Sequence, residues 1–438
     1  MQTTLAATLK NTPQGQEADA ILRSCVHCGF CLATCPTYQL LGDELDSPRG
    51  RIYLMKQMLE GAPVSEQTQL HLDRCLTCRS CETTCPSGVQ YGRLLDIGRA
   101  ITEERVERKP VAALKRFALR KVLPYRRRFA AVYAVARLVR GILPKEIRTK
   151  IPAKSPAAPT ARRPWPPARH ARKMLLLEGC VQPTLAPETN LAAAGVLDRL
   201  GISLVRVRAA GCCGAVAHHL SAHDEAVGQV KHNIEALWPH IEAGAEAIIM
   251  TASACTAMLT DYGHLLREDV AYAKKAQRVS ELAKDVSEVL ATNADTLSAA
   301  LAASGEITRD GQRNAQPLPK VLKVAFQAPC TLQHALKIRG VVESLLTQAG
   351  YSLTPVPDSH LCCGSAGTYS ILQPELSARL LEGKLAALEQ GQPDLIATAN
   401  IGCQTHLRSA TALPVRHWIE LVEASLYREG PIQSPGHN

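Results

Sequence analysis

Aromatic side chains are scarce in this 438-residue sequence, which has only four Phe and three Trp. Hydrophobic residues nevertheless make up 46% of the chain, a share typical of globular proteins with buried cores. The cores must therefore be built mainly from aliphatic side chains. At about 150 residues per domain, the length predicts roughly three domains.

The sequence also lacks a long apolar run. No window approaches the ~18 consecutive apolar residues of a membrane-spanning helix, so we expect no transmembrane segment. The opening residues Met1-Gln2-Thr3-Thr4 have neither the basic nor the apolar region of a secretory signal peptide. We therefore expect a protein of the cytoplasmic side, where thiols stay reduced. Its 16 cysteines are then candidate metal ligands rather than a disulfide framework.

Nucleotide-binding and nucleic-acid-binding motifs are absent as well. There is no G-x-G-x-x-G after a strand and no Walker motif, and the Gly turns at 211–214 and 364–367 are weak phosphate cradles. We expect no flavin on this chain. No nucleic-acid-binding motif accompanies the basic residues, so we expect no nucleic-acid partner.

What the sequence does contain is two copies of the pattern C-x2-C-x2-C-x3-C-P within the first hundred residues. This spacing is typical of 4Fe–4S clusters: one loop supplies three thiolates, and the fourth cysteine, at the start of a following helix, ligates the other cluster. Pro36 and Pro86 restrict the cysteine before them to extended backbone. Zinc ribbons use two C-x-x-C pairs instead. The predicted ligand sets are Cys25, Cys28, Cys31 and Cys85 for one cluster, and Cys75, Cys78, Cys81 and Cys35 for the other.

The two motifs are separated by residues 36–74, where residues 51–59 have an apolar pattern of helical period. We therefore predict an α-helical two-cluster ferredoxin domain over residues 1–104. It is similar to those of iron–sulfur subunits in respiratory dehydrogenases.

A basic connector follows at residues 105–172. Between Arg105 and Lys173 there are 21 Lys/Arg and only two Glu, a local charge of +19, whereas the whole chain carries +10. Residues 111–143 alternate apolar and basic side chains, and Pro124 should separate two helices. Such helices suit an anionic membrane surface. The alternative is that they pack on the ferredoxin domain with a solvated basic face. Residues 151–170 are Pro-rich and predict a semi-rigid linker.

The rest of the chain contains an internal repeat. Cys180 lies 32 positions before Cys212, and Cys330 lies 32 positions before Cys362. Short apolar runs precede these cysteines and helical stretches lie between them, which predicts parallel strands in two α/β domains. The cysteines then follow the carboxyl ends of strands, where open α/β sheets place their sites. We assign the copies to residues 173–291 and 320–438, with a linker at 292–319.

Each copy has a vicinal Cys-Cys-Gly with one cysteine well before it and one well after it. Gly after the pair gives the backbone freedom to point both thiols at one centre. This favours an additional metal site in each copy, and structural thiols are the alternative. The candidate ligands are Cys180, Cys212, Cys213 and Cys255 in the first copy, and Cys330, Cys362, Cys363 and Cys403 in the second. Nearby histidines are candidate ligands or proton relays, although each alone is more often a polar loop residue: His218, His219, His334, His360 and His406.

This arrangement resembles the CCG-domain (heterodisulfide-reductase-like) family, and within it the iron–sulfur subunits of bacterial glycolate oxidases. The resemblance covers nearly the whole chain and is carried by segments 40–54, 71–78, 356–369 and 398–407. In heterodisulfide reductases each copy ends in C-x-x-C. Here Ala252 and Asn400 replace the first cysteine of that pair, so four thiols per copy remain.

The resemblance implies an electron-transfer subunit of an enzyme complex. Clusters pass single electrons, whereas oxidation of a 2-hydroxy acid needs a two-electron organic cofactor, so a flavoprotein partner is implied. Electrons would pass from its flavin (glycolate to glyoxylate) toward the respiratory chain and quinone, with the subunit peripheral at the inner membrane. The alternatives are the equivalent subunit of a lactate or glycerol-3-phosphate dehydrogenase, a heterodisulfide-reductase-like thiol/disulfide enzyme, or a non-enzymatic redox sensor.

Overall fold

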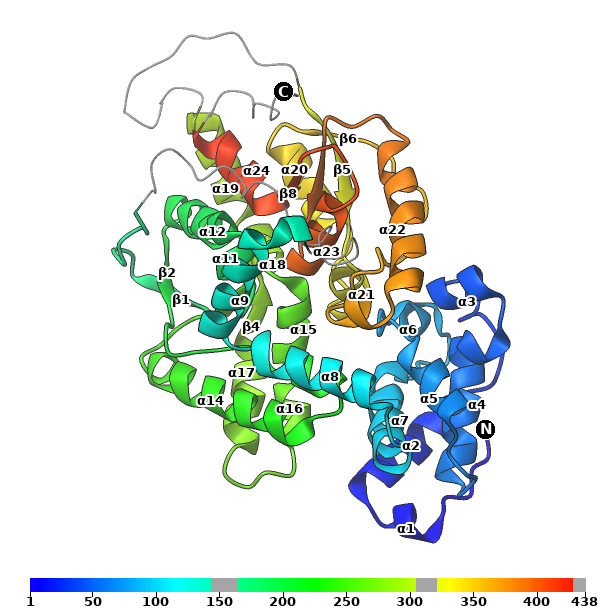
Figure 1. The fold of residues 1–438 in the computed structure, drawn as a ribbon. Helices are drawn as coiled ribbons and strands as arrows, with labels where there is room; N and C mark the ends of the chain where they lie inside the picture. The colour runs from blue at the N-terminus through cyan, green and yellow to red at the C-terminus, as the bar shows by residue number, and fades with distance from the viewer. Residues whose placement is uncertain (143–163, 305–320, 428–438) are drawn as a thin grey trace.

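The computed structural model describes residues 1–142, 164–304 and 321–427. A helical N-terminal lobe lies beside a larger body that contains two α/β units (Figure 1). This is the predicted fold class, a helical ferredoxin domain followed by two α/β repeats.

The N-terminal lobe is entirely helical among its described elements. Thr12, Ser47 and Ser65 cap three of its helices with side-chain oxygens, which accept hydrogen bonds from backbone N–H groups of the first turn. The apolar pattern at 51–59 falls within one of these helices, as predicted. The elements are α1 (Ala7–Lys10), α2 (Pro13–Ser24), α3 (Pro36–Leu41), η1 (Glu44–Asp46), α4 (Pro48–Leu59), α5 (Glu66–Asp73), α6 (Ser80–Thr84) and α7 (Tyr91–Arg105).

The basic connector forms α8 (Pro110–Val122), α9 (Arg126–Leu138) and η2 (Arg140–Ile142), and Pro124 separates the two long helices as predicted. Its basic residues are partly used in ion pairs with both neighbours. Arg116 is buried beside Asp73 of the lobe at 3.7 Å, and Arg120 contacts Glu225 of the first α/β unit at 3.0 Å. The face of α8 that carries Arg116 and Arg120 therefore packs against the lobe and the first α/β unit, as in the alternative that we gave to membrane binding. Most of the Pro-rich linker lies outside the described residues.

The two α/β units repeat one topology. Each has a four-stranded parallel sheet, in the order β2-β1-β3-β4 in the first unit and β6-β5-β7-β8 in the second. The strands are β1 (Arg172–Leu176), β2 (Ile202–Arg206), β3 (Ile248–Met250), β4 (Ala283–Asp285), β5 (Lys323–Gln327), β6 (Ser352–Leu353), β7 (Leu395–Thr398) and β8 (Val415–His417). The short apolar runs of the sequence form the buried central strands of both sheets, β1, β3, β5 and β7.

Helices connect and cover both sheets. In the first unit they are α11 (Gln182–Leu185), α12 (Pro187–Arg199), α13 (Ala215–His219), α14 (His223–Glu242), α15 (Ser253–Thr260), α16 (Tyr262–Leu265), α17 (Ala273–Leu282), α18 (Val286–Thr292) and α19 (Ala294–Ala303). In the second unit they are the π-helical η4 (Thr331–Ala335), α20 (Val341–Gln348), α21 (Tyr369–Leu372), α22 (Pro374–Glu389), α23 (Ile401–Arg408) and α24 (Trp418–Tyr427).

The two units share one hydrophobic core. A single cluster of buried side chains joins Leu176 and Ile202 of the first unit to Val324 and Trp418 of the second. Helix α19 lies in the segment that we assigned to a linker, and its Leu297 is buried in the same core. The remainder of that segment, residues 305–319, lies outside the described residues. Among the helices described, none has the length and apolar character that crossing a membrane requires.

Candidate functional site

The first predicted ligand set lines one cavity of the N-terminal lobe, which contains Cys25, Cys28, Cys31 and Cys85. The first motif bends into a loop through His27 and Gly29, both with positive φ (56° and 87°), which turns the cysteines toward a common centre. Burial, together with a smaller effect of the neighbouring Cys25 thiol, raises the pKa of Cys31 to about 11. A metal centre would offset this cost of grouping thiolates.

The second set, Cys35, Cys75, Cys78 and Cys81, lines an adjacent cavity. The fourth cysteine of each motif thus lies with three cysteines of the other motif, and Cys81 lies on the wall of both cavities. Burial raises the pKa of Cys81 well above its usual range, and the Cys78 thiol raises it further.

One expectation for this site is wrong in part. Cys35 and Cys85 both have extended backbone, and Cys35 precedes helix α3 as predicted. Cys85, however, is followed by a turn at Gly88, with φ +65°, and the next helix begins only at Tyr91. Pro86 prevents Cys85 from being helical but does not by itself start a helix, and the glycine favours the turn.

A buried charge network that sequence reasoning missed lies beside the second cavity. The side chain of Arg51 is 1% exposed, and it donates hydrogen bonds to Asp46 (3.1 Å) and Thr37 (3.1 Å). Its Nη1 lies 4.0 Å from the sulfur of Cys35. Asp46 is also held by Arg74 at 2.8 Å. The sequence offered one sign of this network: Arg51 lies within the apolar pattern of α4.

The thiols of each α/β unit also meet. In the first unit, side-chain contacts link Cys180 to Cys212, Cys212 to Cys213, and Cys213 to Cys255. Gly214 has φ +95°, a conformation that glycine adopts readily and that most other residues avoid. All four cysteines follow the carboxyl ends of β1, β2 and β3.

The second unit repeats this arrangement. The sulfurs of Cys330 and Cys362 are 4.0 Å apart, and contacts continue to Cys363 and Cys403. Asn400, which stands where heterodisulfide reductases have a further cysteine, donates from Nδ2 to the Cys403 sulfur at 3.6 Å.

The second ferredoxin-type set adjoins the thiols of the second unit. Cys78 packs with Cys330 and Cys362 in one apolar cluster that also contains Leu76 and Tyr369. Burial raises the pKa of Cys78 well above its usual range, and among the charges around it Cys330 has the largest effect. The two thiol sites therefore adjoin one apolar cluster at the boundary between the lobe and the body.

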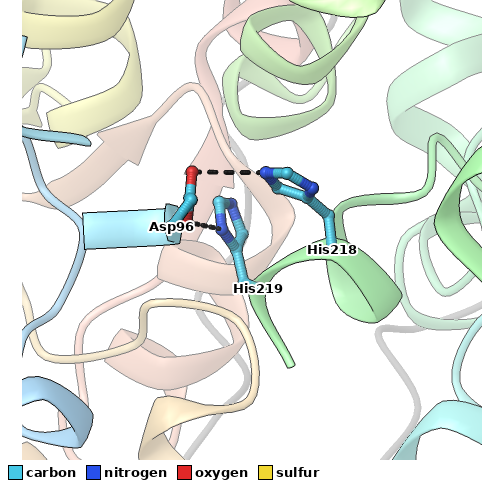
Figure 2. Close-up of side chains that lie close together, drawn as sticks. All are labelled: Asp96, His218 and His219. Carbon is cyan, nitrogen blue, oxygen red and sulfur yellow. Dashed lines mark hydrogen bonds and ion pairs between the residues drawn. The ribbon is translucent and has the colours of Figure 1, made fainter. Parts of the chain in front are cut away.

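A central cavity of about 800 Å³ lies between the lobe and both α/β units. Thiols line part of its wall, among them Cys75 and Cys330. Another part of the wall contains Asp96 of α7 together with His218 and His219 of α13 (Figure 2). His218 Nε2 lies 3.2 Å from Asp96 Oδ2, and His219 Nδ1 lies 3.6 Å from Asp96 Oδ1. Sequence reasoning missed Asp96, because it is 122 positions from His218 and has no motif around it.

Two of the other candidate histidines, His334 and His406, have structural partners, and His360 lines a separate cavity. His334 donates from Nε2 to the backbone oxygen of His360 at 3.0 Å, and its Nδ1 accepts from Thr83 of the lobe at 2.8 Å. His406 lies 3.2 Å from the hydroxyl of Ser377. His334 therefore stabilises the interface with the lobe, and His406 stabilises the second unit, and these two side chains do not meet at a common centre.

Comparisons with known proteins agree with this division of the chain. Residues 21–89 match the family model of the 4Fe-4S dicluster domain, and residues 174–260 and 324–408 each match that of the cysteine-rich domain. The glycolate oxidase iron-sulfur subunit of Escherichia coli is 53% identical over 98% of this chain and 100% of its own length. The probable glycolate oxidase iron-sulfur subunit of Bacillus subtilis is 31% identical over 88% of each chain. Lactate utilization protein A of Exiguobacterium is more distant, at 26% identity over 51% of this chain.

Proposed function

This chain belongs to the family of glycolate oxidase iron–sulfur subunits, and from that premise we propose that it is the electron-transfer subunit of a glycolate-oxidising complex. Substrate oxidation takes place on a flavoprotein partner, because the chain offers thiol sites for one-electron carriers and no nucleotide-binding motif. Electrons pass through this subunit toward the respiratory chain.

The observation that carries the proposal is the exchange of fourth cysteines between the two motifs. Each cavity of the lobe gathers the four thiols of one predicted set, the donor set of a 4Fe–4S cluster, and the first also has Cys81 on its wall. Bound there, the clusters supply one-electron chemistry. Cys25, Cys28, Cys31 and Cys85, which line one cavity, would hold one cluster, and Cys35, Cys75, Cys78 and Cys81, which line the other, would hold the second. Because Cys81 borders both cavities, the two sites are close neighbours.

We also assign a metal centre to the four thiols of each α/β unit. Three of the four thiols in each unit are buried, so this group is costly to ionise without a metal, and soft thiolate donors suit iron–sulfur or zinc centres. Cys78, Cys330 and Cys362 adjoin one apolar cluster, which places the second cluster site of the lobe next to the thiols of the second unit and offers electrons a path between them.

Iron, zinc and acid-labile sulfide analysis of anaerobically purified protein tests the metal assignments. Two clusters account for about eight iron atoms per chain, so the α/β units must add iron or zinc beyond that. A plateau at about eight iron atoms with no zinc would refute the additional centres.

Cys28→Ser should lower the iron content by about four atoms. Val26→Ala is the matched control, since Val26 lies in the same loop, is 67% exposed and has no ligand atom.

Co-purification with partner subunits tests the function. We expect a flavoprotein to accompany the chain, and the complex to reduce an electron acceptor with glycolate faster than with lactate or glycerol 3-phosphate. Cys78→Ser should abolish electron passage to that acceptor while the flavin is still reduced by glycolate. Preference for lactate or glycerol 3-phosphate would assign the subunit to that dehydrogenase. Undiminished passage in Cys78→Ser would refute conduction.

The outer face of the connector supports attachment to a membrane, where quinone is available as an acceptor. Apolar side chains stand exposed along it, among them Leu114 (67%) and Leu138 (89%), with the exposed basic residues Lys115 and Arg127 on the same two helices. Exposed apolar and basic side chains on one helix pair suit the surface of anionic lipid.

Vesicle flotation tests this attachment. We expect the chain to float with vesicles rich in phosphatidylglycerol at low salt and to be released by high salt. Leu138→Glu should weaken binding, whereas Val270→Glu, a matched change at a fully exposed site of the first unit, should not. Equal flotation of both variants would place any membrane contact elsewhere.

A further inference from the structure

The histidine pair after the first Cys-Cys-Gly has a position that the second unit does not reproduce. His218 and His219 lie four and five residues after Gly214, whereas the same positions after Gly364 are Thr368 and Tyr369. In the second unit Tyr369 contacts the lobe through a neutral hydrogen bond to a backbone oxygen, at 3.1 Å. In the first unit two imidazoles meet a carboxylate instead.

The three side chains converge although they come from different parts of the fold. Asp96 lies on α7 of the lobe, and the histidines end α13 of the first unit (Figure 2). One donor atom from each residue lies within 4.8 Å of the other two. The Asp96 and His218 side chains are 21% and 11% exposed. Asp96 Oδ1 is buried and has no hydrogen-bond partner.

The separations fit those of metal ligands. Bonds of ~2.0–2.1 Å in tetrahedral geometry place two donor atoms about 3.4 Å apart. His218 Nε2 lies 3.2 Å from Asp96 Oδ2, and His219 Nδ1 lies 3.6 Å from the other oxygen, Oδ1, so each imidazole has a carboxylate oxygen near that spacing. Two imidazole nitrogens and one carboxylate oxygen form a donor set typical of Zn²⁺ and Fe²⁺ sites.

A second group of two acids and one histidine provides a contrast. Asp43, Asp46 and His71 also lie within reach of one ion, but Asp46 is already neutralised by Arg51 and Arg74, at 3.1 and 2.8 Å. No lysine or arginine forms an ion pair with Asp96 in the part of the chain that the structure describes. In the described residues the two histidines are therefore the ion-pair partners of Asp96, and all three side chains can act together as ligands of one cation.

We propose that Asp96, His218 and His219 bind a divalent transition-metal ion, with Zn²⁺ as the best-fitting probe, at the boundary between the lobe and the first α/β unit. The ion ties α7 to α13, the helix that directly follows Cys213 and Gly214. Three protein ligands leave a fourth position of a tetrahedral ion for water or a small oxygen ligand. That position opens on the central cavity, because all three residues lie on its wall.

Zinc uptake by the cluster-containing chain tests this site. The protein is purified anaerobically and dialysed against buffered Zn²⁺, and zinc, iron and sulfide are then measured in the same sample. The wild type should bind one zinc ion more than Asp96→Asn or His219→Asn, with the same iron content. Loss of a ligand should weaken this zinc affinity by roughly 10–100-fold or more, since loss of supporting residues alone has that effect.

The controls separate this site from the thiol sites and from misfolding. His170→Asn removes a histidine from another carboxylate pair, with Asp198 at 2.9 Å, and should leave zinc uptake unchanged. His219 is 43% exposed, so its replacement should not disturb folding. X-ray absorption at the zinc edge, taken as the difference between the wild type and Asp96→Asn, should show that the added zinc has nitrogen and oxygen ligands at ~2.0–2.1 Å rather than sulfur at ~2.3 Å. Sulfur ligands only, equal uptake by all variants, or no uptake by the wild type would overturn the proposal.

Discussion

His417 should make the body of this protein sensitive to acid. The residue ends β8 in the second α/β unit and is 1% exposed. Its Nε2 donates to the backbone oxygen of Thr251 in the first unit at 2.8 Å, and its Nδ1 accepts from the N–H of Ile419 at 3.2 Å. One ring nitrogen therefore donates a hydrogen bond and the other accepts one, which is possible only while the imidazole is neutral. Burial lowers the pKa of His417 to about 3.

The size of the effect depends on the difference between the pKa of His417 in the folded chain and its pKa in the unfolded chain. An exposed histidine has a pKa of about 6.5, so as the pH falls the unfolded chain takes up this proton first. The stability contributed by neutral His417 is complete above about pH 6.5 and is lost as the pH falls toward about 3. Each pH unit is worth about 1.4 kcal/mol, so the free energy of unfolding should fall by about 2 kcal/mol between about pH 7.5 and pH 5.

Urea unfolding at about pH 7.5, 6 and 5, followed by tryptophan fluorescence, measures this loss, and the adjacent Trp418 is a buried reporter. His417→Gln keeps a donor for Thr251 but cannot titrate. It should be less stable than the wild type at neutral pH, because the bond to Ile419 is lost, and its stability should vary less with pH. His240→Gln, at an exposed position, should follow the wild type. Parallel pH profiles for the wild type and His417→Gln would refute the reasoning.

Three further predictions concern the thiol sites. Arg51→Met removes a positive charge beside Cys35 and should lower the reduction potential of the adjacent cluster by tens of millivolts. A redox titration followed by electron paramagnetic resonance measures this potential. Arg51→Lys keeps the charge and should change the potential less. Gly364→Ala should lower the free energy of unfolding by roughly 2 kcal/mol more than Gly214→Ala does. A Cβ at Gly364 would lie 2.6 Å from a backbone oxygen of α22, whereas a Cβ at Gly214 would lie 3.4 Å from its nearest atoms. Equal losses of stability in the two variants would contradict this prediction. Tyr369→Phe removes a hydrogen bond between the second unit and the lobe, and should cost about 1 kcal/mol in urea unfolding; no change would show that this contact does not hold the lobe.

The ligand loops and the repeat could be predicted because their signals are local. The Cys-x-x-Cys spacing and the following proline restrict the backbone within a few residues, and the 32-residue interval from Cys180 to Cys212 recurs from Cys330 to Cys362. Apolar runs beside turn residues likewise indicated the buried strands. The turn after Cys85 was missed because a proline restricts the residue before it without determining the conformation of the residues after it.

The remaining features depend on contacts between distant segments. Asp96 meets His218 only because the lobe packs on the first unit, and Arg51 meets Asp46 and Arg74 only inside the folded lobe. A single charged residue in an amphipathic helix is usually solvent-exposed, and periodicity alone does not distinguish the rare buried one. Helix α19 was assigned to a linker because Ala, Thr and Ser give a weak apolar pattern, although Leu297 is buried.

The core shared by the two α/β units makes them a dimer within one chain. Trp418 and helix α24 of one half cover helix α12 of the other, so neither half encloses its apolar side chains alone. A covalent link keeps the two halves at a high effective concentration, and identical partners are no longer needed for them to assemble. The paired surfaces are then free to diverge. Where one copy has two histidines against the lobe, its sister has Thr368 and Tyr369, so the two equivalent positions offer different chemistry to the same partner domain.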